Sequence, residues 1–492
     1  MGFAFTILYI VVTIFSPEQF GKEWANYHAL MYLAGITALA SLPSMANYEY
    51  WKASVQTFLL IGFIIAIAMS QVVHGYLGGV IEGLRIFLPS AAVFFFIIVN
   101  VTTVRRLKIV TLATVACCLA LAVEALCGFY GGFNGEMFVM RNNIYGPQDN
   151  VIGQIMRIRG AGFLSDPNDF AQILLIMLPL SFLAWRRGRT VTNFFVVLLP
   201  TALILWTVYL THSRGALVAL AAIALMTARK KLGTTTSAIL AGVFILGMLA
   251  LDFTGGRGIS AADGADRLEA WANGLEMFKS APLFGVGFNN FTDLYEITAH
   301  NSFVLCLAEL GLLGSTLWIG LLVTTTIGLN RIIGGKSRIL ARKLYGFFPL
   351  FEMSTFSDVG VNVPEMSSPF SDGTMALENA YAHDMLPPLA EGNADGAAFE
   401  TNMEAEPVPL PLIPRSWVVA MRLGLIAFMM TAWFLSRSYT TTMYLVLGLA
   451  TATIALHEGP GKQSDRGHWV FSTVTVEFVM IFLIYCLVRF RH

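Results

Sequence analysis

The chain has 492 residues, of which 56% are hydrophobic and only 13% charged, and its mean hydropathy is +0.67. Soluble proteins carry about one-quarter charged residues, so this composition excludes an ordinary cytosolic enzyme, a nucleic-acid-binding protein and a disulfide scaffold. The net charge is zero, but residues 344–414 hold eleven acidic and no basic residues, which leaves 31 basic against 20 acidic residues elsewhere. The sequence therefore indicates a basic membrane protein with one acidic insert.

Thirteen apolar segments approach the length that a membrane-crossing helix needs, about 20 residues. None of them alternates in the manner of barrel strands. We therefore predict an all-α integral membrane protein, a polytopic bundle of about twelve, or thirteen, transmembrane helices with a large structured periplasmic loop. The predicted spans are 3–15, 27–43, 55–73, 80–100, 109–128, 167–184, 194–211, 215–228, 237–252, 301–329, 417–435, 441–456 and 469–488.

The positive-inside rule predicts the orientation of these spans. With the N-terminus in the cytoplasm, fifteen Lys and Arg residues fall in five short inner loops and eight fall in the much longer outer segments, as far as the tenth span. Two long loops then lie outside. The predicted divisions are N-terminal helices 1–128, a periplasmic loop 129–166, central helices 167–252, a large periplasmic loop 253–300, a single helix 301–330, the insert 344–414 and C-terminal helices 415–492.

The loop 253–300 has internal structure. Apolar residues recur at helical spacing between Leu268 and Phe278 and stop before Pro282. Asp266 followed by Glu269 forms a capping pattern. We expect an amphipathic helix along the membrane surface, where a lipid-linked substrate would lie.

The acidic insert 344–414 contains nine of the eighteen prolines and many Ser, Gly and Asn residues. Such a segment buries too little apolar surface to offset its ordering entropy, so disorder is the expectation. Its predicted cytoplasmic position separates it from chemistry on the outer side.

His300 opens the tenth span directly after the large loop, and two interpretations stay open from the residues alone. It is either an interfacial polar residue that starts a helix or a general base, since an ordinary histidine pKa of about 6.5 suits proton abstraction near neutral pH. Glu309 lies about 13.5 Å deeper and half a turn around the helix. An intramembrane carboxylate needs a partner on another element.

Four of the arginines on the predicted outer side are candidates for a binding role, because the usual charge bias disfavours cations there. Arg214 follows the seventh span, Arg267 heads the surface helix, and Arg157 and Arg159 lie in the first long loop. Bidentate recognition of a diphosphate would explain them; lipid headgroup contacts or ordinary salt bridges are the alternative, favoured for Arg157. The sequence has no DxD motif and no His, Asp or Glu cluster with metal-ligand spacing, so we predict neither a metal site nor a cofactor.

The region 155–330 resembles the bacterial O-antigen ligase and O-antigen polymerase superfamily. The most specific feature is a His-Asn pair followed by nine residues and a Gly-x-x-Gly pattern, which is met at every fixed position. The residues that carry the resemblance are Gly162-Phe163, Pro167-Asn168, Ser213-Arg214-Gly215, Arg267 with Trp271, Pro282-Leu283-Phe284-Gly285-Val286-Gly287, His300-Asn301 and Gly311-Leu312-Leu313-Gly314.

The resemblance implies an inner-membrane glycosyltransferase with a GT-C-like fold. Such an enzyme transfers an undecaprenyl-diphosphate-linked glycan to an acceptor hydroxyl at the periplasmic face. The reaction would be inverting and metal-independent. His300 would be the catalytic base, and Arg214, Arg267 and Arg159 would bind the diphosphate. Asn301, Glu309 and Trp271 would support them. O-antigen ligation to lipid A-core is the favoured product.

Other products and other classes stay open. A polymerase with a glycan acceptor or a protein O-oligosaccharyltransferase of the same superfamily would share these residues. A lipid-linked glycan flippase or transporter would also have many spans, with charges in the middle of the bundle and interrupted helices in both halves. A membrane scaffold would depend on the insert. Membrane lipids are expected partners in every case, and nucleic acid in none.

Overall fold

The computed structural model describes residues 1–17, 29–47, 54–145, 151–250, 253, 261–334, 413–458 and 468–489. These residues belong to one compact unit that comprises Met1–Glu352 and Pro411–His492. The insert predicted to be disordered, 344–414, lies outside the described residues except for its last two.

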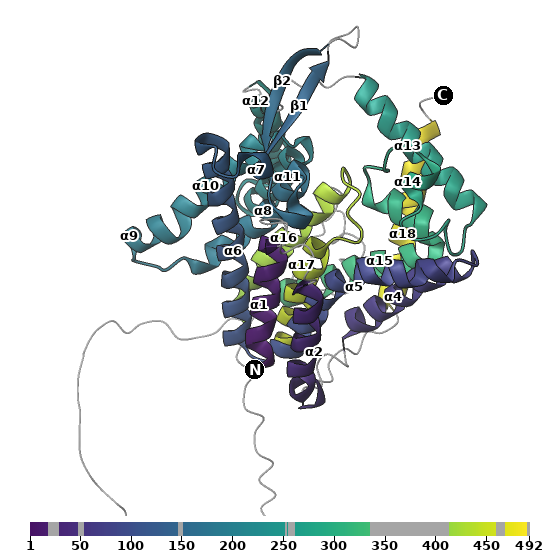
Figure 1. Cartoon of the computed structure of the whole chain (residues 1–492). Coiled ribbons are helices and arrows are strands. Elements are labelled where there is room, and N and C mark those ends of the chain that lie inside the picture. Colours follow the sequence, from purple (N-terminus) through teal and green to yellow (C-terminus); the bar gives the residue numbers. More distant parts are fainter. Residues whose placement is uncertain are drawn as a thin grey trace, which may run out of the picture. The chain divides into compact units, whose positions relative to one another are not determined.

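Each of the thirteen predicted spans corresponds to a helix, and the observed bounds differ from the predicted ones by up to five residues (Figure 1). Their bounds are α1 Gly2–Phe15, α2 Ala29–Asn47, α4 Val55–Val72, α5 Leu77–Asn100, α6 Val104–Gly131, α8 Pro167–Ser181, α9 Thr190–Asn193 continued by a π-helical turn into α10 Leu199–Leu210, α11 Arg214–Leu232, α12 Thr234–Ala250, α15 Ser302–Gly334, α16 Arg415–Ala432, α17 Thr441–Glu458 and α18 His468–Arg489.

Nine helical segments in the described part of the chain are long and apolar enough to cross a membrane, and α1 and α12 are shorter apolar helices. The prediction of an all-α polytopic membrane protein is confirmed. Helix α13, Ala261–Ser280, covers the segment expected to be amphipathic, and α14 spans Phe291–Leu294.

A β-hairpin in the first long loop was not anticipated. The short helix α7, Gly135–Phe138, leads into β1, Val139–Tyr145, which pairs antiparallel with β2, Val151–Ile158. On β2, Ile155 and Arg157 are buried whereas Gln154 and Met156 are exposed, which is the two-residue period of a half-buried strand. Because one of the buried positions is an arginine, the alternation of apolar and polar residues that predicts a strand is not visible in the sequence.

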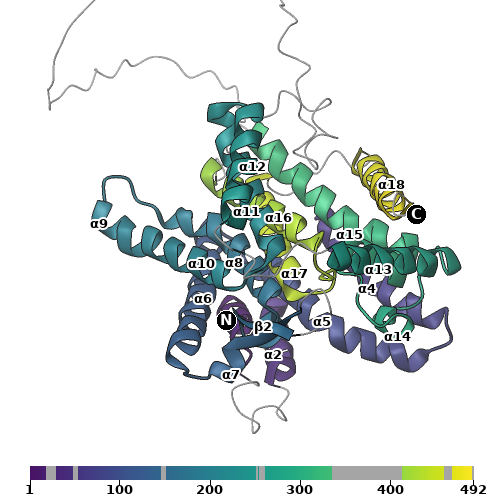
Figure 2. The ribbon, with the colours of Figure 1, turned by 90° about the horizontal axis from the view of Figure 1, so that it is seen from above.

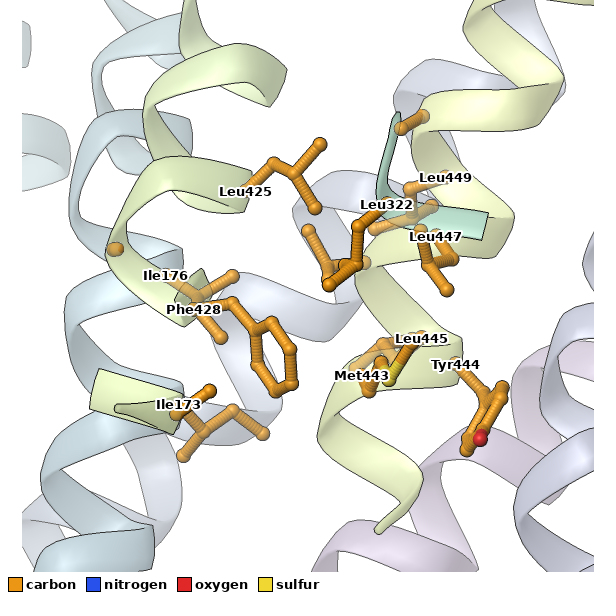
Figure 3. Packing of buried hydrophobic residues seen from close by; sticks show 14 of the residues in the cluster. Ile173, Ile176, Leu322, Leu425, Phe428, Met443, Tyr444, Leu445, Leu447 and Leu449 are labelled. Atoms are coloured by element: carbon orange, nitrogen blue, oxygen red, sulfur yellow. The ribbon is translucent and has the colours of Figure 1, made fainter. Parts of the chain in front are cut away.

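The core is built from helices that are apolar on most faces. Ile173 and Ile176 of α8 point toward Phe428 of α16, with Met443 and Leu445 of α17 on the other side (Figure 3). All five side chains are at most 1% exposed. Helix α16 contacts α8, α11, α15 and α17, so it fixes the helices whose ends form the site described next. Figure 2 shows α13 alongside α15, which it contacts.

Candidate active site

A pocket of about 300 Å³ opens where the N-termini of three helices meet. It is lined by side chains from the start of α8, the start of α11, helix α13, the loop that leads into α15 and the segment that follows α16. The lining residues are Asn168, Ser213, Arg214, Gly215, Asp266, Arg267, Ile297, His300, Phe434 and Leu435. Three residues singled out from the sequence, His300, Arg214 and Arg267, therefore line one pocket.

His300 is half-buried and lies immediately before α15. Its φ of 48° is in the left-handed region, a conformation that non-glycine residues adopt at a cost and that is enriched at functional sites. Flanking contacts hold it there. Trp271 Nε1 donates a hydrogen bond of 2.9 Å to the carbonyl of Ala299, and the Asn301 side chain caps α15 by accepting hydrogen bonds from the backbone N–H groups of Phe303 and Val304.

Burial lowers the pKa of His300 below its ordinary value, and the positive charges of Arg267 and Arg437 lower it further, whereas Asp166 opposes the shift. Each cation disfavours a charged imidazolium, so His300 is neutral at neutral pH. A neutral imidazole can accept a proton.

Arg214 is the first residue of α11. The preceding residue, Ser213, caps this helix through its hydroxyl, which accepts from Ala216 N at 3.4 Å. The following residue, Gly215, lets the segment after α16 approach, because a Cβ at Gly215 would meet Phe434 Cβ at 3.3 Å. The Ser-Arg-Gly sequence thus combines a helix cap, a cation that lines the pocket and a close backbone contact.

Helix α8 begins in a similar way. Asp166 Oδ1 accepts from the backbone N–H of Asn168 at 2.7 Å, and the Asn168 side chain lines the pocket. The positive ends of α8, α11 and α15 therefore face the same space as Arg214 and Arg267. Helix N-termini and guanidinium groups both favour anions, so the pocket is suited to a ligand with several negative charges.

Helix α13 carries Arg267 and Asp266 to the opposite wall of the pocket. It begins at Ala261, five residues before the predicted cap, so Asp266 lies within the helix and does not cap it. Its apolar side packs on α15 and α18. Trp271 is 7% exposed and packs edge-to-face against Trp433, with ring centroids 5.7 Å apart.

Arg159, the third predicted diphosphate ligand, is not among the residues that line this pocket. Its guanidinium donates to the carbonyls of Met137 (2.8 Å) and Glu136 (2.9 Å), which ties the end of β2 to α7. The neighbouring Arg157 donates to the carbonyl of Thr211 and to Asn168 Oδ1. Arg157 therefore joins the starts of α11 and α8, in keeping with the structural role favoured for it.

Glu309 is 3% exposed and lies away from the pocket. Its Oε1 accepts from the backbone N–H of Phe291 at 3.1 Å. The expected partner on another element is thus a backbone group in the large loop. Glu309 therefore holds that loop against α15.

Helix α15 is interrupted two residues later, at Gly311, where φ is 62° and ψ is −161°. The segment 282–287 pairs with the opened backbone on both sides of the break. Val286 N and Gly287 N donate to the carbonyls of residues 308 and 309, and the N–H groups of residues 312 and 313 donate to the carbonyls of Pro282 and Leu283, all at 2.9–3.1 Å. The glycines in the two motifs allow this contact, because a Cβ at Gly285 or Gly311 would collide with the facing backbone.

An ion pair beside the pocket was missed from the sequence. Arg437, between α16 and α17, donates through Nε to Asp169 Oδ1 in the first turn of α8. Only the position of Arg437 in the sequence could have indicated it. The residues Ser436-Arg437-Ser438 form the polar connection between two predicted spans, on the same predicted side of the membrane as the two long loops.

Residues 199–319 match the family model of the O-antigen ligases. This quarter of the chain is therefore similar to the O-antigen ligases. Comparison with curated proteins gives no match. The O-antigen ligase match runs from the start of α10 into the middle of α15 and includes Arg214, Arg267, His300 and the interruption at Gly311. Asn168, Asp169 and Arg437 lie outside it. The apolar helices indicate a multi-pass membrane protein, and the match supports an enzyme that is similar to the O-antigen ligases in this region.

Proposed function

We propose that the protein transfers a glycan from undecaprenyl diphosphate to an acceptor hydroxyl at the periplasmic face of the inner membrane, with lipid A-core as the acceptor. One observation carries the proposal. A half-buried histidine with a lowered pKa shares a pocket with two arginines and three helix N-termini. A base beside a polyanion site is what a glycosyl diphosphate donor and a hydroxyl acceptor require.

The reaction is a single displacement at the anomeric carbon of the donor. The acceptor oxygen attacks this carbon while its proton passes to the neutral imidazole of His300. The bond between the anomeric carbon and the diphosphate oxygen breaks, and its electron pair stays on the leaving diphosphate. The products are a glycosidic bond of inverted configuration, undecaprenyl diphosphate and a protonated His300.

Arg214 and Arg267 bind the diphosphate and stabilise the charge that grows on it as it leaves. Preorganised donors of this kind act most strongly on charge that develops in the transition state. The N-termini of α8 and α11 add to the same field. A leaving group stabilised in this way needs no protonation.

The distribution of cations supports a periplasmic site. The opposite helix ends carry Arg105, Arg106 and Lys108 in the first turns of α6, and three further arginines between α8 and α9. Short loops rich in Lys and Arg are typical of the cytoplasmic side. The pocket lies at the other ends of these helices, where an exported lipid-linked glycan would be met.

The decisive experiment is a transfer assay with the full-length protein in detergent and a defined undecaprenyl-diphosphate glycan. Lipid A-core, a second donor molecule and a Ser- and Thr-bearing protein are offered in parallel as acceptors. His300→Ala should lower kcat/KM by about 10²–10⁴-fold, the usual contribution of a general base. Arg214→Ala and Arg267→Ala should each lower it by about 10²-fold.

Matched controls are His74→Ala and Arg141→Ala, because both side chains are exposed and neither lines the pocket. Both should transfer glycan at the wild-type rate. Full activity of His300→Ala would remove the base from the mechanism, and loss of activity in EDTA would remove its metal-independence. Product formed only from the second donor or only from the protein would reassign the enzyme to a polymerase or a protein glycosyltransferase.

One observation favours a transporter as the second candidate. Helix α15 is interrupted at Gly311, and Glu309 and Glu477 are buried near the break. Transporters use broken helices with charged groups at such positions. Here the break is closed by backbone hydrogen bonds from residues 282–287. Movement of a fluorescent lipid-linked glycan across proteoliposomes without acceptor would support transport, and transfer without such movement would support the enzyme.

A further inference from the structure

The segment between α16 and α17 binds the chain on both sides of the proposed base. Before it, Thr298 Oγ1 donates to Ser436 Oγ at 2.8 Å. After it, the backbone N–H of Arg437 donates to Ser302 Oγ at 2.8 Å, and Ser438 Oγ donates to the carbonyl of Ser302 at 2.7 Å. The start of α15 is therefore held by a second element, independently of α13.

The Arg437 side chain extends this attachment to α8. Its guanidinium pairs with Asp169, whose side chain is 7% exposed. Asp169 directly follows Asn168, which lines the pocket, whereas Arg437 itself does not line it. Arg437 thus joins α15, which begins just after the proposed base, to α8, whose N-terminus borders the pocket.

We propose that Arg437 is a positioning residue for glycan transfer, which holds His300 and the start of α8 at the separation that the reaction needs. Its backbone fixes α15 through Ser302, and its side chain fixes α8 through Asp169. This inference rests on the proposed function. Positioning of this kind matters because a displacement of about 1 Å at a reacting group can cost about 10²-fold in rate.

The charge of Arg437 provides a second, separable signature. The charged groups that face His300 are Arg267 and Arg437, which lower its pKa, Asp166, which raises it, and Arg214 and Asp266, which line the same pocket. Removal of the Arg437 charge should raise the pKa of His300, so the acid limb of the pH profile should move to higher pH. A purely structural contact would not move that limb.

The test compares Arg437→Gln, Arg437→Lys and Asp169→Asn in the transfer assay, with kcat, donor KM and the pH profile of kcat/KM measured for each. Arg437→Gln should lower kcat by about 10–100-fold, leave donor KM within about three-fold, and move the acid limb upward. Arg437→Lys should lower kcat but keep the limb in place, because the charge remains. Asp169→Asn should lower kcat without the upward move.

The matched control is Arg331→Gln, which breaks an ion pair of 3.1 Å between Arg331 and Glu458 at the opposite ends of the helices. It should leave all three quantities unchanged. Thermal unfolding in detergent identifies any variant that fails to fold. If Arg437→Gln does not fold, the kcat values and pH profiles of Arg437→Lys and Asp169→Asn test the proposal instead.

An active wild type with unchanged kcat and pH profile in Arg437→Gln overturns this inference alone. A loss of kcat in Arg331→Gln as large as that in Arg437→Gln overturns it as well, because the loss would then follow from breaking any ion pair between helices. A wild type that transfers glycan to none of the acceptors overturns the proposed function and this inference with it.

Discussion

The indole Nε1 of Trp271 donates a hydrogen bond of 2.9 Å to the backbone carbonyl of Ala299, the residue that precedes His300. The same helix carries Arg267 into the pocket. One rigid element thus carries a proposed diphosphate ligand and restrains the backbone of the proposed base, so the two groups keep their relative positions.

Trp271→Phe should keep the aromatic packing and remove this hydrogen bond. Ala299 is fully buried, and a buried carbonyl that loses its donor costs about 1–3 kcal/mol. We expect a lower unfolding temperature and a rate of transfer reduced by about ten-fold. The comparison is Trp206→Phe, which removes a hydrogen bond to the exposed Tyr130 hydroxyl and should change neither quantity.

The pH dependence should report the lowered pKa of His300. The base works in its neutral form, and burial, Arg267 and Arg437 all disfavour the charged form. The acid limb of kcat/KM should therefore lie below the ordinary histidine pKa of about 6.5. Arg267→Gln should move it to higher pH, although the maximum also falls, and Asp166→Asn should move it to lower pH. Identical limbs in wild type and both variants would contradict this assignment.

Gly311→Ala should be strongly destabilising. Its φ of 62° is unfavourable for alanine, and the added methyl group would collide with the backbone of residues 283 and 285. Backbone strain combined with a clash of this kind costs more than about 2 kcal/mol. Gly242→Ala in α12 is the comparison, since a Cβ there meets open space. Thermal unfolding in detergent should separate the two by many degrees; equal stability would mean that α15 can close without the break.

Asn301→Ala should shift stability by about 0.5–2 kcal/mol, the usual value of an N-cap. The Asn301 side-chain oxygen accepts from two backbone N–H groups, whereas its buried Nδ2 has no hydrogen-bond partner among the residues that the structure describes. Asn301→Asp keeps the acceptor and should preserve the helix start. Chemical unfolding of the two variants measures the difference in their free energies of unfolding. Equal destabilisation by both would mean that Asn301 stabilises the protein through its amide nitrogen and not through its oxygen.

The helices could be predicted because a bilayer imposes one strong rule, about 20 apolar residues for each crossing. All thirteen predicted spans correspond to helices where the structure describes them. The hairpin could not be predicted in this way, because Arg157 occupies an inward position on β2 and its pairing with Asn168 is a tertiary contact. The local pattern of apolar and polar residues does not show which distant side chain a buried arginine will contact.

The pocket was predictable only in part. His300 and Arg214 stand out because they are titratable or charged residues at span ends, and Arg267 stands out because it is a cation at the head of the predicted surface helix. Arg437 and Asp169 do not, because an arginine in a short polar connection and an aspartate in the first turn of a helix are both common. Only the fold brings these two side chains together across 268 positions of sequence. Arg159 shows the converse case. It is a cation on the predicted outer side, but its guanidinium donates to two nearby backbone carbonyls and does not line the pocket.

The backbone pairing between residues 282–287 and the interrupted part of α15 has a consequence for engineering. A loop graft from a related enzyme that ends before Ser302 would exchange one partner of this pairing and keep the other. Mismatched halves would leave N–H and C=O groups unsatisfied inside the bilayer, where that is most costly. The smallest exchangeable cassette for swapping substrate preference should therefore extend through Ser315, so that both partners travel together.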